Sequence, residues 1–406
     1  MTQRQIKTGY FALAALNTLA TSYFLNYLYF FLRDHFGFAN LQNLGISAVY
    51  GFIYIFAAWQ CGKFAQRRGF HTSLKFGFAG LTLCMIVGGI FNSVPGIFCA
   101  LGGYGVVLLF IWPALEALVS ENEPDSRVPH MIGIYNCTWA AAAAFSYFSG
   151  GKLYDWNDRA AVFWIPAAIF FLQWLIAFYL SKQAARIPMR KFKSVEVSPS
   201  HAEAPVSQPL THPKIFLKMA WLANPFAYVA VTTLIAVMPG LAQRLNLSPT
   251  KVGLFCSVWF FGRLAAFALL WKWISWHYKF RWLLAAFLLL IASFMVILLA
   301  MQLWLVVFAQ IFFGFAVGLI YYSSLFYSMD VGEATQGEHG GLHEAAIGAG
   351  IFAGPAVGAA SLKFLPQYAN VGIFAVSALL VCGLVGLIWL QMSRKHSVGE
   401  NRTALL

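Results

Sequence analysis

The chain has 406 residues, of which 60% are hydrophobic and only 10% are charged, and its formal net charge is +13. Charged residues make up about 25% of a typical soluble domain, so this composition excludes a soluble globular enzyme and predicts a chain that lies in lipid. In lipid, backbone groups must be satisfied within the protein, which leaves helices or the strands of a closed barrel. Barrel strands would alternate over about 10 residues. Runs such as 284–299 do not alternate, so helices are predicted.

Six apolar segments follow one another in the first half, and six more follow in the same order about 209 residues later. Each is close to the ~20 residues that a helix needs to cross a bilayer. The predicted spans are 10–32, 41–61, 73–92, 96–118, 131–150, 161–181, 219–241, 252–271, 282–301, 303–327, 341–362 and 370–392. The predicted fold class is therefore an all-α integral membrane protein, with twelve transmembrane helices in two six-helix bundles.

The sequence changes character between the two sets of spans. From about Ser181 to Pro213 it is polar, and five basic residues precede Ser194. This composition is typical of a linker, which is either a plain tether or lies with its basic part on anionic lipid. The predicted domains are an N-terminal bundle (1–181), a cytoplasmic linker (182–214), a C-terminal bundle (215–393) and a cytoplasmic tail (394–406).

The positive charge follows the predicted loops. If the N-terminus is cytoplasmic, 20 of the 27 Lys and Arg residues fall on the cytoplasmic side, 6 fall on the outer side, and Arg263 falls within a span. Lys and Arg are enriched on the cytoplasmic side of membrane proteins, so both chain ends are predicted to be cytoplasmic. The charge thus indicates topology, and we expect no nucleic-acid partner. We expect a multi-pass protein of the plasma membrane, or of the inner membrane in a bacterium, with an uncleaved first span.

The loop between the second and third spans carries a family signature. Gly62, Arg67 and Gly69 occupy three of its positions, while Gln66 stands where the family has Asp and Phe70 where it has Arg. With twelve spans, two matching halves and a long central loop, the chain resembles the major facilitator superfamily over almost its whole length. The resemblance implies a secondary transporter that works by alternating access, with its site where the two bundles meet.

In the superfamily, this loop forms part of a cytoplasmic latch against the end of the fourth helix. The resemblance implies a latch made of Gly62, Gln66, Arg67, Arg68, Gly69, Glu116 and Glu121. Partly exposed ion pairs contribute only ~0–1 kcal/mol each, which suits a contact that breaks in every cycle. The alternative is that Arg67 and Arg68 only fix the topology.

Ionisable residues within spans are costly in lipid unless they face a cavity or a partner, so they mark candidate functional positions. Arg263 lies near the middle of the eighth span, and Glu344, next to His343, lies about one turn into the eleventh. We expect Arg263 to bind an anionic group of the substrate, and Glu344 with His343 to carry a coupled proton. The alternative is a permanent structural pair between Arg263 and Glu344.

Polar side chains on several spans predict the wall of a central path, because facilitator helices 1, 4, 7 and 10 line such a path. Besides Arg263, the predicted substrate-binding residues are Asn17, Thr21, Asn26, Tyr135, Asn136, Trp139, Tyr228, Thr232, Gln310, Tyr321, Tyr322 and Ser324. Small residues four apart, such as Gly314 with Gly318 and Gly350 with Gly354, allow helices to approach closely. Their role is either sliding during transport or simple tight packing.

The function predicted from these features is secondary transport of a small solute, coupled to protons by symport or antiport. An organic anion or metabolite is the expected substrate because of Arg263. The alternatives are efflux of hydrophobic compounds or drugs, or a different class, a transporter-like receptor or membrane enzyme. No phosphate-binding Gly-rich loop and no Cys/His spacing typical of zinc occur in the sequence. We therefore expect no enzyme, cofactor or metal, and a monomer whose partners are the solute, the proton and the bilayer.

Overall fold

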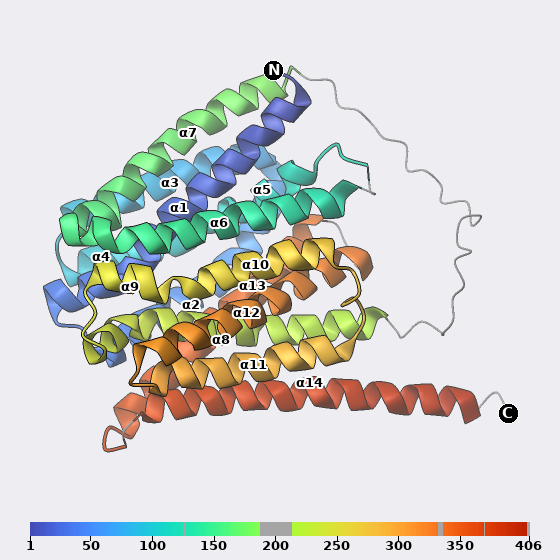
Figure 1. Ribbon diagram of the computed structural model, residues 1–406. Coiled ribbons are helices and arrows are strands. Elements are labelled where there is room, and N and C mark those ends of the chain that lie inside the picture. Colours follow the sequence, from blue (N-terminus) through green and yellow to red (C-terminus); the bar gives the residue numbers. More distant parts are fainter. Residues whose placement is uncertain (125–126, 187–212, 332–335, 369, 404–406) are drawn as a thin grey trace.

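The computed structural model describes residues 1–124, 127–186, 213–331, 336–368 and 370–403, and these ranges form helices and turns without any strand (Figure 1). The helices are α1 (Gln3–Phe36), α2 (Asn40–Arg68), α3 (Phe70–Ile90), α4 (Val94–Val107), η1 (Leu108–Phe110), α5 (Trp112–Ser120), α6 (Val128–Trp156), η3 (Ala160–Trp164), α7 (Ile165–Ala184), α8 (Pro213–Arg244), α9 (Pro249–Cys256), α10 (Val258–Lys272), α11 (Phe280–Leu299), α12 (Leu303–Val331), α13 (Gln336–Phe364) and α14 (Val371–Thr403).

Each predicted span coincides with one helix or with a run of consecutive helices. The fourth span is divided into α4, η1 and α5, where Pro113 lies in the first turn of α5 and cannot donate to the preceding turn. The eighth is divided into α9 and α10 at Ser257. The residues predicted as a tail continue α14 as far as Thr403. Most of the predicted linker, 187–212, lies outside the described residues.

Ten helical runs in the described part of the chain are long and apolar enough to cross a membrane. The helices α1 and α6 are not among these ten, although they have 34 and 29 residues and pack beside the others. Both contain buried polar side chains, including Asn17 and Asn26 in α1 and Asn136 in α6. These lower the mean hydropathy of α1 and α6, and they also make the two helices candidates for lining a path.

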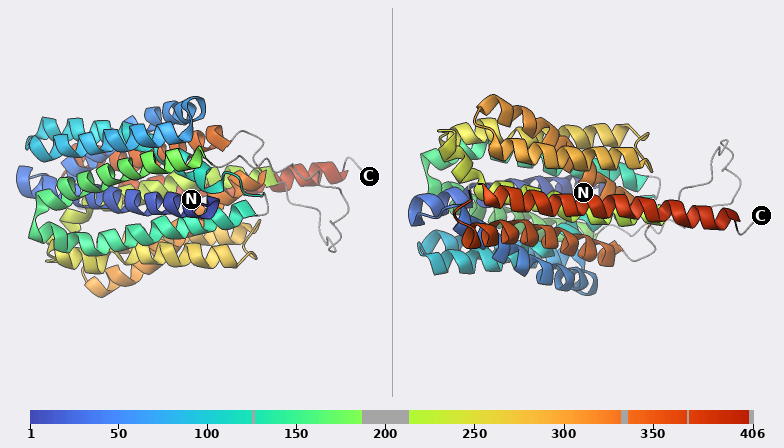
Figure 2. Two further views of the ribbon diagram at one scale, coloured as in Figure 1. Left: turned by 90° about the horizontal axis from the view of Figure 1, so that it is seen from above. Right: turned by 90° about the horizontal axis from the view of Figure 1, so that it is seen from below.

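The helices form two halves, α1–α7 and α8–α14, which lie side by side with their long axes roughly aligned (Figures 1 and 2). The halves meet along two seams. In one seam α2 packs along α13, and in the other α6 packs along α9 and α10. A smaller contact joins α1 to α8.

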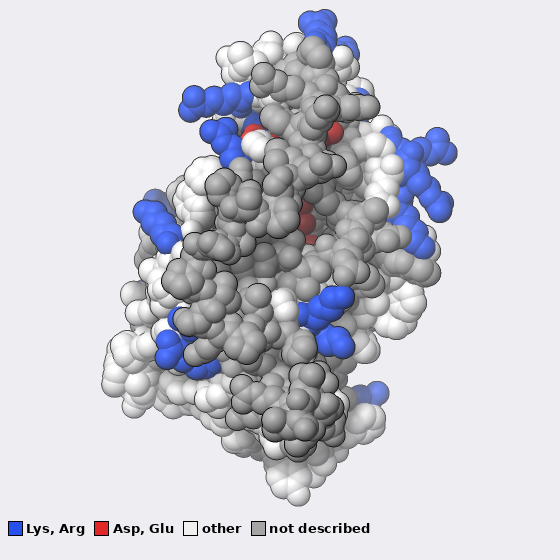
Figure 3. Space-filling model, turned by 90° about the vertical axis from the view of Figure 1, so that its right-hand side faces the viewer, with Lys and Arg blue, Asp and Glu red and all other residues white. Residues whose placement is uncertain are grey.

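The start of α1, the end of α7 and the start of α8 lie at one end of the bundle, which we call the linker end (Figures 1 and 2). The end of α1 and the start of α2 lie at the opposite end, the far end. Figure 3 views the linker end and shows Lys and Arg side chains spread around its margin, with a few acidic atoms nearer its middle. The described surface at the linker end thus carries many basic side chains.

Glycines bring the backbones of the two halves into close contact along both seams. A Cβ on Gly51 of α2 would collide with the backbone of Phe352 in α13. In the second seam, a Cβ on Gly151 of α6 would collide with the carbonyl of Pro249 at the start of α9, and one on Gly133 would lie 2.5 Å from the ring of Trp271. Close helix approach at small residues is therefore present at both seams.

Candidate functional site

Arg263 is enclosed by aromatic rings at the second seam. Its side chain projects from α10 and the residue is only 5% exposed. The guanidinium carbon lies 4.5 Å from the ring centroid of Trp139, 4.9 Å from that of Tyr321 and 5.4 Å from that of Phe267. Trp139 belongs to α6 of the first half, so the cation contacts both halves. Such cation–π contacts contribute about 0.5–2 kcal/mol each.

The backbone of Arg263 is held in place by α12. A Cβ on Gly314 would lie 2.8 Å from the backbone nitrogen of Arg263, and one on Gly318 would lie 3.3 Å from its carbonyl oxygen. The predicted small-residue pair of the tenth span thus lets α12 lie directly against α10 at Arg263. The guanidinium is presented from a fixed position.

The charge of Arg263 is only partly satisfied. One terminal nitrogen donates to the hydroxyl of Tyr228 at 3.5 Å, while the buried Nε has no hydrogen-bond partner. Arg263 forms no ion pair with any acidic side chain that the structure describes. A buried cation without a described counter-charge is costly, so Arg263 is a candidate position for contact with a ligand.

Glu344 occupies the first seam. It lies in α13, is 8% exposed, and accepts a short hydrogen bond from the hydroxyl of Tyr54 in α2 of the other half. The neighbouring His343 is also buried, and its Nδ1 lies 3.3 Å from the hydroxyl of Ser324 in α12. Its Nε2 has no partner. An acid and an imidazole with free capacity, buried next to an inter-half contact, are suited to holding and releasing a proton.

Arg263 and Glu344 form no ion pair with each other, because each lies at a different seam and has its own partners. They share an electrostatic neighbour. The hydroxyl of Tyr321 lies within electrostatic range of Arg263, Glu344 and Glu116, and Glu116 lies within range of Glu344. The structure therefore gathers one buried cation, two carboxyls and several tyrosines in a single central cluster.

Other predicted residues are buried with unused hydrogen-bonding groups. Asn17 is fully buried and neither atom of its amide has a partner, and the buried Thr21 hydroxyl is also unpaired. Asn136 accepts from the indole nitrogen of Trp139 at 2.9 Å, which orients that ring, and its own Nδ2 is unpaired. Tyr135 is buried within electrostatic range of both Glu116 and Glu344. Unpaired buried amides of this kind are candidate contacts for a polar ligand.

Some predicted residues have local partners instead. Thr232 donates to the carbonyl of Tyr228 in its own helix at 2.7 Å, and Gln310 donates to the carbonyl of Phe255 at 3.0 Å. Tyr322 packs against Trp276 within the second half, with ring centroids 6.0 Å apart. Asn26 is buried in α1. The described contacts of Thr232, Gln310 and Tyr322 lie within the second half.

The predicted latch residues at the end of α2 lie at the linker end, and the predicted ion pairs with Glu116 and Glu121 are not formed among the described residues. Gly62 lies within α2, Gln66, Arg67 and Arg68 are exposed in its last turn, and Gly69 joins α2 to α3 with a φ of 86°. Neither arginine forms an ion pair with a described acidic side chain, including the partly buried Glu116 and the exposed Glu121. A latch in another conformation of the cycle stays a prediction.

Sequence reasoning missed several residues of the site. Tyr54 donates to Glu344, and Phe267 completes the rings around Arg263. Asn224 of α8 is a second buried asparagine with both amide atoms unpaired, although no described contact joins it to Arg263 or Glu344. The position of Asn224 in an apolar span was a usable signal, the same one that selected Asn17. Tyr54 and Phe267 carried no such signal, because isolated aromatic residues are common in membrane helices.

Comparison with known proteins agrees with this architecture. The sequence profile of the Major Facilitator Superfamily matches residues 10–226 and again residues 220–405. The chain belongs to the Major Facilitator Superfamily. It is accordingly a multi-pass integral membrane protein and a transporter of the superfamily rather than an enzyme. The two successive matches agree with the internal repeat.

Solved structures of transporters share the fold of this superfamily member. The human organic anion transporter MFSD10 (TETRAN) is 15% identical with a TM-score of 0.66, covering 95% of this chain and 100% of its own. PepTSo, a transporter of the POT family, is 13% identical with a TM-score of 0.75, covering 98% and 99%. A bacterial homologue of the human lysosomal transporter Spinster, inward-facing and occupied, is 12% identical with a TM-score of 0.66, covering 97% of both chains. No curated protein matched the sequence.

Proposed function

We propose that this protein transports a small organic anion together with a proton, by alternating access across twelve membrane-spanning helices. The observation that carries the proposal is Arg263, a buried cation between the two halves with aromatic neighbours and no described acidic partner. In the same proposal the linker end is cytoplasmic, because 20 of the 27 Lys and Arg residues fall on the side of the predicted spans to which the start of the chain belongs.

The surroundings of Arg263 favour a particular kind of anion. Its unpaired Nε and partly used terminal nitrogens suit a carboxylate or a phosphate, which guanidinium groups bind through paired hydrogen bonds. The rings of Trp139, Tyr321 and Phe267 suit an apolar or planar body attached to that anion. The fold likeness to a transporter named for organic anions is consistent with this substrate class.

The coupling follows from the charges of the cluster. An anion that neutralises Arg263 removes positive charge from the neighbourhood of Glu344, and this favours the protonated carboxyl. Substrate and proton then bind together, which is the requirement for symport. Protonation also changes the hydrogen bond with Tyr54 across the first seam, so it acts directly on a contact between the halves.

Two substitutions test the two roles in proteoliposomes, after a panel of carboxylates and phosphates has been screened for stabilisation of the purified protein. Arg263→Gln is expected to lower the affinity for a stabilising anion about 10- to 100-fold, because hydrogen bonds to charged groups contribute about 1.5–3 kcal/mol. Arg263→Lys should retain part of the affinity for the anion. The exposed Arg281→Gln is the matched control. Unchanged affinity in Arg263→Gln would overturn the anion assignment.

For the proton, Glu344→Gln is expected to abolish accumulation driven by a pH gradient while sparing exchange of substrate at equal concentrations. Intact accumulation in this variant would remove Glu344 from the proton path.

A second candidate function, efflux of hydrophobic compounds, is favoured by the same aromatic rings. It predicts that Trp139→Leu reduces transport of an apolar dye while Arg263→Gln leaves that transport unchanged. The opposite sensitivity, with Arg263 essential and neutral dyes not transported, supports the anion carrier.

A further inference from the structure

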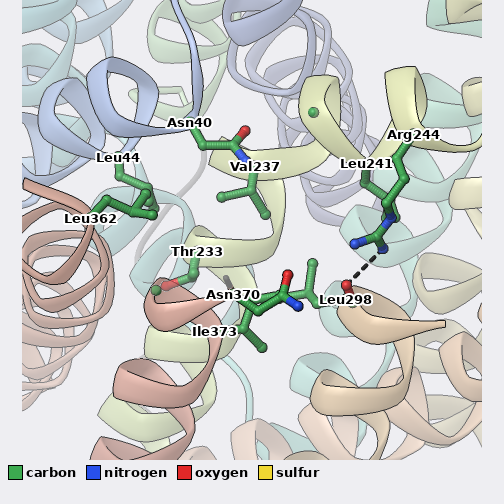
Figure 4. Close-up of a pocket in the computed structure, with 12 residues that line it drawn as sticks. Asn40, Leu44, Thr233, Val237, Leu241, Arg244, Leu298, Leu362, Asn370 and Ile373 are labelled. Carbon is green, nitrogen blue, oxygen red and sulfur yellow. Dashed lines mark hydrogen bonds between the residues drawn. The ribbon is translucent and has the colours of Figure 1, made fainter. Parts of the chain in front are cut away.

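A separate cavity of about 230 Å³ lies at the far end of the molecule, between α2 of the first half and α8, α11, α13 and α14 of the second (Figure 4). Polar side chains from three different segments line it, namely Asn40, Thr233, Arg244 and Asn370. A second hollow of about 590 Å³ borders it and shares three lining residues, Asn40 among them. None of the residues assigned above to anion or proton binding lines either space.

Arg244 is the charged group of this cavity. One of its terminal nitrogens donates to the carbonyl of Leu298 at 2.6 Å and to that of Ala300 at 3.4 Å, where α11 ends. Its Nε is buried and has no hydrogen-bond partner. No acidic side chain in the described ranges forms an ion pair with Arg244, whereas Arg33 in the bordering hollow is paired with Asp34 at 2.7 Å.

The rest of the lining also suits a negative charge. The described residues that line the two spaces include no Asp or Glu. Asn40 and Asn370 supply amide groups from the two halves, and Figure 4 shows the Asn370 amide in the middle of the lining residues. The Thr233 hydroxyl, in a residue that is 3% exposed, has no partner. A cation, two amides and an unpaired hydroxyl without an acid form a set that binds anions.

We propose that this far-end cavity binds an anionic group, a carboxylate or a phosphate, between Arg244 and the amides of Asn40 and Asn370. Tyr228, which contacts Arg263, lies in the same helix α8 as two residues of the cavity. Along the helix axis Thr233 is about 7.5 Å from Tyr228, and Arg244 is about 24 Å from Tyr228. One helix therefore connects the far-end cavity with the central site. The role as a second station for the transported anion rests on the proposed function, but anion binding in the cavity does not.

The test uses the full-length protein in nanodiscs of zwitterionic lipid, carrying Arg263→Gln so that the central site is disabled. Benzoate and inorganic phosphate are compared with chloride at equal ionic strength, and the thermal midpoint Tm is measured. We expect both probes or one of them to raise Tm by several degrees, and Arg244→Gln to abolish the rise. Arg159→Gln, an arginine at the far end outside both linings, should leave it unchanged.

Asn370→Asp is a second test, which does not depend on correct folding of the Arg244→Gln variant. It leaves the hydrogen bonds from Arg244 to α11 in place and adds a negative charge that repels an anion. Asp also tolerates the positive φ of 59° at this position. This variant should lose the anion-dependent rise in Tm as well.

A second arm separates a soluble anion from a lipid phosphate by adding phosphatidylglycerol to the nanodiscs. Stabilisation by this lipid that depends on Arg244, without an effect of the soluble probes, assigns the cavity to a lipid headgroup. If neither soluble anions nor the anionic lipid stabilise the protein through Arg244 and Asn370, the proposal is overturned. If soluble anions stabilise the parent protein but no longer stabilise Arg263→Gln, the stabilisation comes from the central site. This outcome would overturn the far-end site and leave the proposed function standing.

Discussion

The two seams between the halves are built alike and carry opposite charges. In the seam of α2 and α13, Glu344 of one half accepts a hydrogen bond from Tyr54 of the other. In the seam of α6 and α10, Arg263 of one half lies over the ring of Trp139 of the other. In the proposed function, a proton neutralises the first charge and an anion neutralises the second. The comparison suggests that each ligand acts on its own seam, and that transport requires both seams to change.

The largest expected effect comes from filling the first seam. Gly51→Val places side-chain atoms against the backbone of Phe352. Overpacking costs about 1–3 kcal/mol, so the conformation described here should become roughly 5- to 150-fold less populated and transport should fall with it. Spin-label distances across α2 and α13, together with flux in proteoliposomes, measure both changes.

Gly45→Val in the same helix is the control, because no atom lies within 4 Å of a Cβ there. Equal losses in the two variants would show that α2 tolerates no valine at either position. The loss in Gly51→Val could then not be assigned to the close contact between α2 and α13.

The next effect concerns the polar contact of the first seam. Tyr54→Phe removes the donor to Glu344 and should reduce pH-driven accumulation about 10- to 100-fold, since hydrogen bonds to charged groups contribute about 1.5–3 kcal/mol. Anion binding at Arg263 should remain, because loss of this donor favours the protonated carboxyl of Glu344, which is the form that accompanies the bound anion in the proposed symport. Tyr50→Phe, a buried neighbour one turn away in α2, should behave like the parent protein. Loss of anion affinity in Tyr54→Phe would contradict this coupling.

A smaller effect is expected from the aromatic contact of the second seam. Trp139→Leu removes one cation–π contact of about 0.5–2 kcal/mol and should shift the conformational equilibrium roughly 2- to 30-fold, while Trp139→Phe should retain part of it. The distance between labels on α6 and α10 reports this shift. Identical behaviour of the Leu and Phe variants would show that volume, and not the ring, is what Arg263 requires.

The smallest effect is expected at the far end of the second seam. Asp155 of α6 accepts from the backbone nitrogen of Thr250 at 2.9 Å, in the first turn of α9 in the opposite half. A carboxylate at a helix N-terminus contributes about 0.3–1 kcal/mol. Asp155→Asn should therefore weaken this contact by a factor between about 1.7 and about 5. Accessibility of a cysteine introduced at Lys152 measures opening of the far end. If Asp155→Asn shifts the conformational equilibrium more than Trp139→Leu does, the aromatic contact is not the stronger of the two contacts in this seam.

The spans were predictable because the length of an apolar run is set by the bilayer, and because the repeat identified even α1 and α6, whose polar residues lower their hydropathy. Arg263 and Glu344 were predictable for the same reason, since charges stand out in apolar helices. Their partners were not predictable. Positions along two helices give heights above the membrane boundary, but the direction in which each side chain points around its helix depends on packing between the halves. That packing placed Arg263 against Trp139 and Glu344 against Tyr54.

Lys7, near the start of α1, has a practical consequence for engineering this protein. Its ammonium group lies 2.6 Å from the carboxylate of Glu123 and 3.3 Å from the carbonyl of Val119, and the residue is only 7% exposed. Deleting the first seven residues would leave the Glu123 carboxylate and this carbonyl without their cation. Affinity tags and fluorescent fusions therefore belong ahead of an intact leading segment, and a shortened variant should yield less protein from expression.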